Sequence, residues 1–171
     1  MMNKEVVKLI NEQINKELYS AYLYLDIANF YTGKNLNGFA NWFNIQAQEE
    51  RDHALLFKDF LLNNGEEVKL EAIGAPDVPF PDLKAPLTAA LEHEKFITAS
   101  IYGIYDAATA GKEYKAFKIL NWFVSEQEEE EKNSDELIQK YDLFASDGKG
   151  LYMLDQEFAA RIYTAPSLVL D

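Results

Sequence analysis

Six polar residues recur at spacings that would bring them together inside a helical protein. In each half of the chain a lone glutamate is followed by two polar residues three positions apart, a spacing that puts both side chains on one face of a helix. Carboxylate oxygens and imidazole nitrogens are ligands for hard and borderline metal ions. The pattern therefore predicts a metal site formed by Glu17, Glu50, His53, Glu94, Gln127 and Glu130.

The two halves of the chain repeat the same spacing. The lone glutamate precedes the two members of its pair by 33 and 36 residues in both halves, and an offset of 77 residues carries Glu17 onto Glu94 and His53 onto Glu130. This repeat indicates one pseudo-symmetric site to which each half contributes one carboxylate and one pair. Because the second pair is Gln127 and Glu130 rather than a glutamate and a histidine, the two parts of the site are expected to be unequal.

These residues interrupt apolar stripes. Four long segments have apolar residues at alternating steps of four and three, the pattern of helices packed against one another. Each stripe is apolar except near its middle, where it carries at least one carboxylate, and no Lys or Arg occupies a stripe position. A buried carboxylate without a partner is costly. Divalent cations are therefore the expected compensation.

The start and stop signals divide the chain into five helices. Asn3 is a suitable N-cap for the first helix, and Gly33 and Gly65 end the first and second. Three prolines and a glycine exclude a helix from the connection 65–82, which is expected to be extended. The predicted helices span residues 4–32, 37–64, 83–110, 113–144 and 151–161.

The lengths of the connections predict the topology. Short turns make antiparallel hairpins of the first two and the next two long helices, and the connection 65–82 is long enough to return along the bundle. The expected fold is all-α, a single domain over residues 1–171. It is a four-helix bundle with one long crossover between the second and third helices and a short fifth helix at the C-terminal end. The tail 162–171 is expected to be either a surface strap or a disordered end.

The composition of the chain limits the ligands and macromolecules that it is expected to bind. The chain has no cysteine, which excludes thiolate metal sites and disulfides. Its 29 acidic and 16 basic residues give a formal net charge of −13, so nucleic acid and anionic membrane surfaces are not expected partners. No apolar run approaches the roughly 20 residues that span a bilayer, and the N-terminus has no apolar signal core. We therefore expect a cytoplasmic protein.

Five segments carry a resemblance to a known family: NEQINKELYSAYLY, AQEERDHALLF, EHEKFIT, NWFVSEQEEEEK and GKGLYMLDQE. Over nearly its whole length the chain resembles the prokaryotic non-haem ferritins of the bacterial ferritin A type, which have the ferritin-like four-helix bundle. The resemblance implies a first iron site at Glu17, Glu50 and His53. It implies a second at Glu94 and Glu130, with Glu50 bridging the irons and Gln127 beside them.

The same resemblance assigns further residues. Tyr24 matches a tyrosine that hydrogen-bonds near the di-iron centre and is expected to take part with the six residues above. A third, outer iron site is implied at Glu49, Glu126 and Glu129, for which Glu130 is a further candidate. The remaining acids of the run SEQEEEEK, Glu128 and Glu131, are expected to be solvated. His93 is predicted to be a surface or interface residue, and Trp42 and Trp122 core or interface residues.

The implied activity is oxidation of Fe(II) to Fe(III) by dioxygen or hydrogen peroxide, followed by storage as ferric mineral in a 24-subunit cage whose fifth helices line fourfold contacts. Haem is not expected, because Arg51 stands where bacterioferritins carry a haem-binding methionine. Two alternatives stay open: a metal-buffering or mineral-nucleating shell without oxidation chemistry, and a metal-free scaffold bundle, against which the buried acids argue.

Overall fold

The structure, a computed structural model, describes residues 1–170. Within this range the chain forms five α-helices and one short 3₁₀ turn, and no strand. None of these helices is long and apolar enough to cross a membrane. The elements are α1 (Lys4–Gly33), α2 (Asn37–Asn63), α3 (Ala85–Ala110), η1 (Tyr114–Ala116), α4 (Phe117–Phe144) and α5 (Gly148–Ala159).

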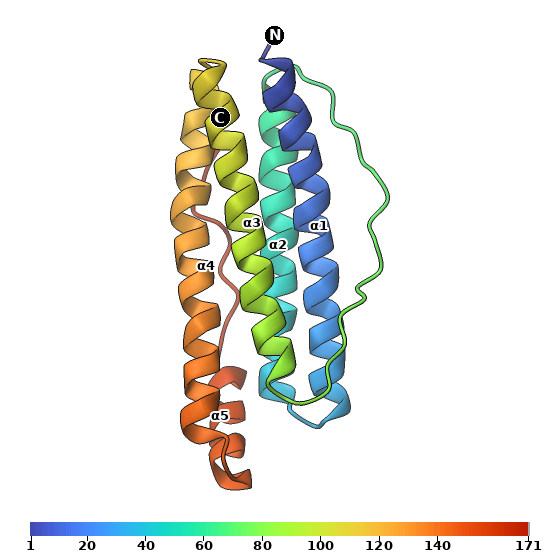
Figure 1. The fold of residues 1–171 in the computed structure, drawn as a ribbon, viewed down its shortest axis with the longest axis vertical. Helices are drawn as coiled ribbons and strands as arrows, with labels where there is room; N and C mark the ends of the chain where they lie inside the picture. Colours follow the sequence, from blue (N-terminus) through green and yellow to red (C-terminus); the bar gives the residue numbers. More distant parts are fainter. Residues whose placement is uncertain (171) are drawn as a thin grey trace.

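Helices α1 to α4 lie side by side along the long axis of the molecule, and α5 sits at one end (Figure 1). Short turns join α1 to α2 and α3 to α4, and the crossover runs the length of the bundle beside α1. The predicted all-α bundle with one long crossover and a short fifth helix is thus confirmed. The short α1–α2 turn and the long crossover also place the N-terminal ends of α1 and α3 at opposite ends of the bundle.

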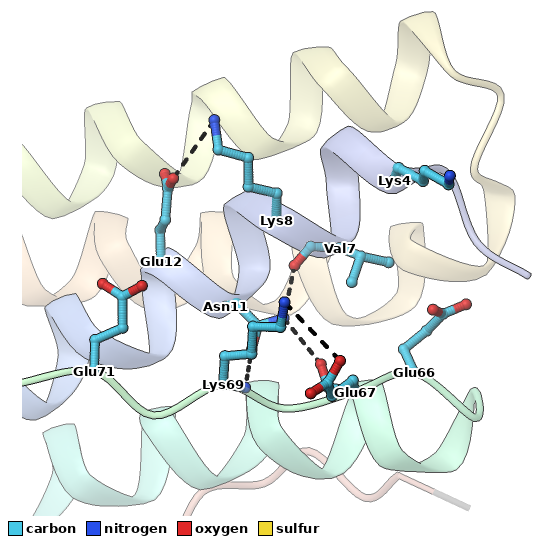
Figure 2. Close-up of a pocket in the computed structure, with 9 residues that line it drawn as sticks. All are labelled: Lys4, Val7, Lys8, Asn11, Glu12, Glu66, Glu67, Lys69 and Glu71. Atoms are coloured by element: carbon cyan, nitrogen blue, oxygen red, sulfur yellow. Dashed lines mark hydrogen bonds and ion pairs between the residues drawn. The ribbon is translucent and has the colours of Figure 1, made fainter.

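Asparagines hold the crossover against α1. The Asn11 side chain donates to the Glu67 carbonyl oxygen (3.1 Å) and accepts from the Lys69 backbone N–H (2.7 Å), and Asn15 Nδ2 donates to the Ala72 carbonyl oxygen (3.1 Å). A surface pocket of about 470 Å³ lies at this junction (Figure 2). Its charged side chains come from α1 and the crossover, and none of the predicted metal ligands lines it.

Side-chain caps set the helix ends. Asn3 Oδ1 accepts from the Glu5 and Val6 backbone N–H groups, as its N-cap position predicted. The fifth helix begins at Gly148, three residues before the predicted start, because Asp147 caps it by accepting from the Gly150 N–H (2.8 Å). A cap at the start of the SDGKG stretch therefore turns most of a predicted loop into the first turn of α5.

Two apolar clusters fill the bundle, one toward each end. In α1 the first cluster ends at Ile14 and the second begins at Leu23, and α4 passes from the first cluster at Phe123 to the second at Leu137. The buried residues that lie between the clusters are polar in all four helices. A polar layer thus crosses the middle of an otherwise apolar core.

The C-terminal residues 160–170, here called the C-terminal strap, run from α5 back along the bundle (Figure 1). Leu168 and Leu170 pack against the first apolar cluster, and Ser167 Oγ accepts from Trp122 Nε1 (3.0 Å). Tyr163 donates a hydrogen bond to Asp52. Of the two alternatives for the tail, the strap is the one observed over the described residues.

Candidate metal centre

The polar layer contains all six residues that the spacing singled out. Each is at most 5% exposed, and each of the four long helices contributes at least one. Helical periodicity explains why they meet, because five of them occupy stripe positions near the middle of the helices and His53 lies one turn from Glu50 beside its stripe. The residues are Glu17 on α1, Glu50 and His53 on α2, Glu94 on α3, and Gln127 and Glu130 on α4.

Glu17, Glu50 and His53 form the tightest group. One ligand atom from each lies within 4.8 Å of the others. In the described part of the chain, only three buried side-chain N or O atoms lack a hydrogen-bond partner, and they are Glu17 Oε2, Glu50 Oε1 and His53 Nδ1. Unpaired buried polar atoms are rare because each costs free energy. Three of them on neighbouring ligand-type side chains fit a bound cation.

A second group shares the same histidine. His53, Glu126 and Glu130 also bring one ligand atom each within 4.8 Å. His53 Nε2 lies 3.6 Å from Glu126 Oε1, whereas its Nδ1 lies 3.5 Å from Glu50 Oε2. The ring therefore presents one nitrogen to the interior carboxylates and the other to the outer acid.

Glu94 lies outside both groups, and hydrogen bonds fix its carboxylate. Gln127 Nε2 donates to Glu94 Oε2 (3.0 Å), and the Tyr24 hydroxyl donates to the other oxygen. Tyr24 is completely buried and thus orients an acid of the centre. Gln127 does the same from α4 through its amide nitrogen.

The acids of the centre resist ionisation. Burial raises the pKa of Glu94 to about 7, and burial together with the nearby Glu94 raises the pKa of Glu130 to about 8. Burial and the charge of Glu94 also raise the pKa of Glu50 well above its ordinary value. Burial is the largest single influence on the pKa of His53 and lowers it, but the carboxylates of Glu50, Glu126 and Glu17 together outweigh burial and leave that pKa well above its ordinary value. Protons therefore neutralise part of the cluster, and a cation can replace them.

Sequence analysis missed two buried glutamines that orient the acids. Gln13 Nε2 donates to Glu17 Oε1 (2.8 Å), and Gln46 Nε2 donates to Glu130 Oε2 (2.5 Å). Each glutamine lies four residues before a predicted ligand, Glu17 or Glu50, and so on the same helix face. This spacing of four residues is the sequence signal that could have identified both glutamines.

The predicted outer site is assembled only in part. Glu126 faces His53, but Glu129 is exposed and belongs to neither group of ligand atoms. Glu49 is half-buried, and its Oε2 lies 2.6 Å from Arg161 Nη2 of the C-terminal strap. Glu128 is exposed, as predicted.

The aromatic and histidine residues near the centre have definite packing partners. His93 is half-buried, with its Nε2 2.7 Å from Ser20 Oγ and its ring against Tyr24, so it is more enclosed than a surface residue would be, and the interface alternative stays a prediction. Burial lowers its pKa to about 4, which keeps it neutral. Trp122 packs edge-on against the ring of His53. Trp42 lies under Arg161.

The comparisons with known proteins agree with this geometry. A family model for the ferritin-like domain matches residues 7–144. The chain is 39% identical over 156 residues to a bacterial non-heme ferritin of Campylobacter jejuni, covering 91% of this chain and 93% of that protein. It is 35% identical over 163 residues to a bacterial non-heme ferritin of Staphylococcus saprophyticus, covering 95% and 98%.

A solved structure gives the same result. An open-pore ferritin from the hyperthermophilic archaeon Archaeoglobus fulgidus superposes with a TM-score of 0.91 at 36% identity, covering 94% of this chain and 98% of that one. The polar layer, the crossover topology and these similarities agree. The chain belongs to the ferritin family, in which it resembles the bacterial non-heme ferritins over nearly its whole length.

Proposed function

We propose that the protein is a cytoplasmic iron-storage ferritin that oxidises Fe(II) at a carboxylate-rich di-iron centre inside each subunit. The observation that carries this proposal is the set of three unpartnered buried atoms on Glu17, Glu50 and His53. A structural ion-pair network would satisfy such atoms within the protein. The free atoms on these three side chains remain available to a metal ion.

Two Fe(II) ions are the substrate in this proposal. Glu17, Glu50 and His53 hold the first, and Glu94 and Glu130 hold the second, with Glu50 between them. The charges of Glu94 and Glu50, and of Glu94 and Glu130, oppose one another's ionisation, and a cation among them relieves that repulsion. Tyr24 and Gln127 keep the Glu94 carboxylate in place.

The donor set suits oxidation. Anionic oxygen ligands stabilise Fe(III) more than Fe(II), which favours loss of an electron from each ion. With dioxygen as the oxidant, the two electrons and two protons convert one dioxygen to hydrogen peroxide. With hydrogen peroxide as the oxidant, the two electrons and two protons convert it to two molecules of water. Haem has no part in this scheme. The ferric product is stored as mineral in a 24-subunit cage, to which the acidic chain would supply a cation-attracting surface.

The test is aerobic addition of Fe(II) to the purified protein, followed by the absorbance of ferric species. Glu50→Ala removes a ligand expected at both ions, and we expect the initial rate to fall at least about tenfold, a loss of about 1.4 kcal/mol of transition-state stabilisation. Glu128→Ala, which removes an exposed acid of the same acidic run, is the matched control and should leave the rate unchanged.

The outcomes separate the alternatives. A Glu50→Ala variant that oxidises iron as fast as wild type would contradict the proposed centre. Wild-type protein that oxidises iron no faster than buffer but still takes up ferric iron would indicate a mineral-nucleating shell instead. Elution at the monomer position in size-exclusion chromatography would contradict the cage.

A further inference from the structure

Arg161 is anchored where the C-terminal strap passes α2. Its Nη1 donates to Gln46 Oε1 (2.8 Å) and to the Trp42 carbonyl oxygen (3.2 Å), and its Nη2 lies 2.6 Å from Glu49 Oε2. The guanidinium also stacks on the Trp42 ring, 4.2 Å from its centroid. Its side chain is 16% exposed and that of Glu49 is 17% exposed, so water screens this ion pair only weakly.

The guanidinium lies at the outer edge of the metal centre, which is formed by the acids Glu49 and Glu126. Burial raises the pKa of Glu49 and the charge of the nearby Glu126 raises it further, and Glu126 in turn faces His53. Among the described residues Arg161 is the only arginine or lysine paired with Glu49 or Glu126, while His53 faces Glu126 from the interior. Arg161 therefore supplies one positive charge at the place where an outer metal ion would need Glu49.

A hydrogen-bond chain connects the same guanidinium to the centre. Arg161 donates to the amide oxygen of Gln46, which leaves the amide nitrogen of Gln46 to donate to Glu130 Oε2 (2.5 Å). A flipped amide would face Arg161 with its donors and Glu130 with its acceptor. Both neighbours therefore enforce one orientation, and Arg161 is held independently of any bound ion.

The residues present do not fit the third iron site that the resemblance to the bacterial ferritins implied. Glu129 is exposed and apart, and Glu49 is committed to Arg161. We propose that the guanidinium of Arg161 takes the place of a third metal ion at Glu49, so that each subunit binds ions only at its interior centre while the C-terminal strap is docked. This inference rests on the proposed di-iron centre, but it concerns a different question, namely whether Glu49 is available to a further metal ion.

The number of bound ions tests the inference. Zn²⁺, which has no redox chemistry, is titrated into the assembled protein by isothermal titration calorimetry. Arg161→Ala should bind about one more ion per subunit than wild type, because removing the guanidinium leaves Glu49 without its cationic partner. The double variant Arg161→Ala, Glu49→Gln should return to the wild-type number.

Two further variants complete the test. Arg51→Ala removes the only other arginine, which is exposed and pairs with Asp52, and should leave the number of ions unchanged. Glu49→Gln alone keeps Arg161 in place and should also bind the wild-type number, a result that holds even if Arg161→Ala fails to fold.

Two results would overturn the inference: an unchanged number of ions in folded Arg161→Ala, or the loss of one ion in Glu49→Gln alone. Failure of the di-iron centre itself gives a different result. In that case Glu50→Ala would bind as many ions as wild type, whatever happens at Glu49.

Discussion

Buried carboxylates set the chemistry of the centre at the scale of single residues. Glu17, Glu50, Glu94 and Glu130 are at most 5% exposed, and no lysine or arginine pairs with them in the described range. Three glutamines and one tyrosine donate hydrogen bonds to these carboxylates instead, and His53 lies beside Glu50. The folded protein therefore holds a cluster that is stable only when protons or cations neutralise it.

The pH dependence of stability follows from the sign of these shifts. The pKa of Glu130 rises from 4.5 to about 8 in the folded protein. Its carboxyl is protonated in both folded and unfolded states below about pH 4.5, so folding gains nothing there from ionisation. As pH rises toward 8, only the unfolded state ionises freely, and the folded state loses relative stability.

Glu130→Gln should remove this dependence. We expect the free energy of unfolding of the metal-free variant to exceed that of wild type by on the order of 2 kcal/mol near pH 8, with the difference shrinking toward pH 5. Urea denaturation of chelator-treated protein across this pH range measures it. Glu131→Gln, on the same helix, is the control. A constant difference at every pH would contradict the burial argument.

At the scale of elements, α5 completes the N-terminal end of α2. The residue before α2, Leu36, has no side-chain cap, and Asp155 of α5 accepts from the Gly38 and Phe39 backbone N–H groups instead (2.8 and 3.0 Å). A Cβ on Gly38 would lie 1.7 Å from the Asp155 carbonyl oxygen. The docking of α5 therefore depends on a glycine at position 38.

Gly38→Ala should displace α5 and destabilise the fold by about 2 kcal/mol or more, because the clash is with backbone and the two capping bonds are lost with it. Gly103→Ala is the matched control, since a Cβ at that position in α3 meets no atom within 4 Å. The control should instead gain about 0.5–1 kcal/mol from helix propensity. Thermal unfolding of both variants gives the comparison. If Gly38→Ala were as stable as wild type, the close approach of α5 to α2 would not require glycine at this position.

At the scale of the whole molecule, the centre joins all four long helices between two apolar clusters. Each cluster contains residues from α1 to α4, and the polar layer is where the bundle lacks apolar contact. An ion held by ligands from several helices would link them at this level. Metal binding and bundle stability are therefore coupled.

Zn²⁺ should raise the thermal unfolding temperature of the wild-type protein. At a free concentration one hundred times the dissociation constant, one site adds about 2.7 kcal/mol to the free energy of unfolding. Glu50→Ala should lose most of this gain, whereas Glu128→Ala should keep it. Differential scanning calorimetry with and without chelator measures the shift. A gain that is the same in all three proteins would place the stabilising ions outside the centre.

Periodic local patterns made much of the molecule predictable. The stripes predicted the four long helices, and the repeated spacing predicted that Glu17, Glu50, His53, Glu94, Gln127 and Glu130 would share one buried layer, as they do. Helical geometry fixes the direction of a side chain from its position in the stripe. The lengths of the connections then predicted two antiparallel hairpins joined by one long crossover.

Contacts between distant residues decided the rest. Arg161 meets Glu49 across 112 positions, Asp155 meets Gly38 across 117, and Tyr24 meets Glu94 across 70. No local pattern encodes such pairs, because a strap or a short helix can dock in many registers until packing selects one. The sequence by itself determined that the six ligand-type residues enter the polar layer. Only the tertiary structure decided which of their atoms remain free for a metal ion and which are held by hydrogen bonds or by Arg161.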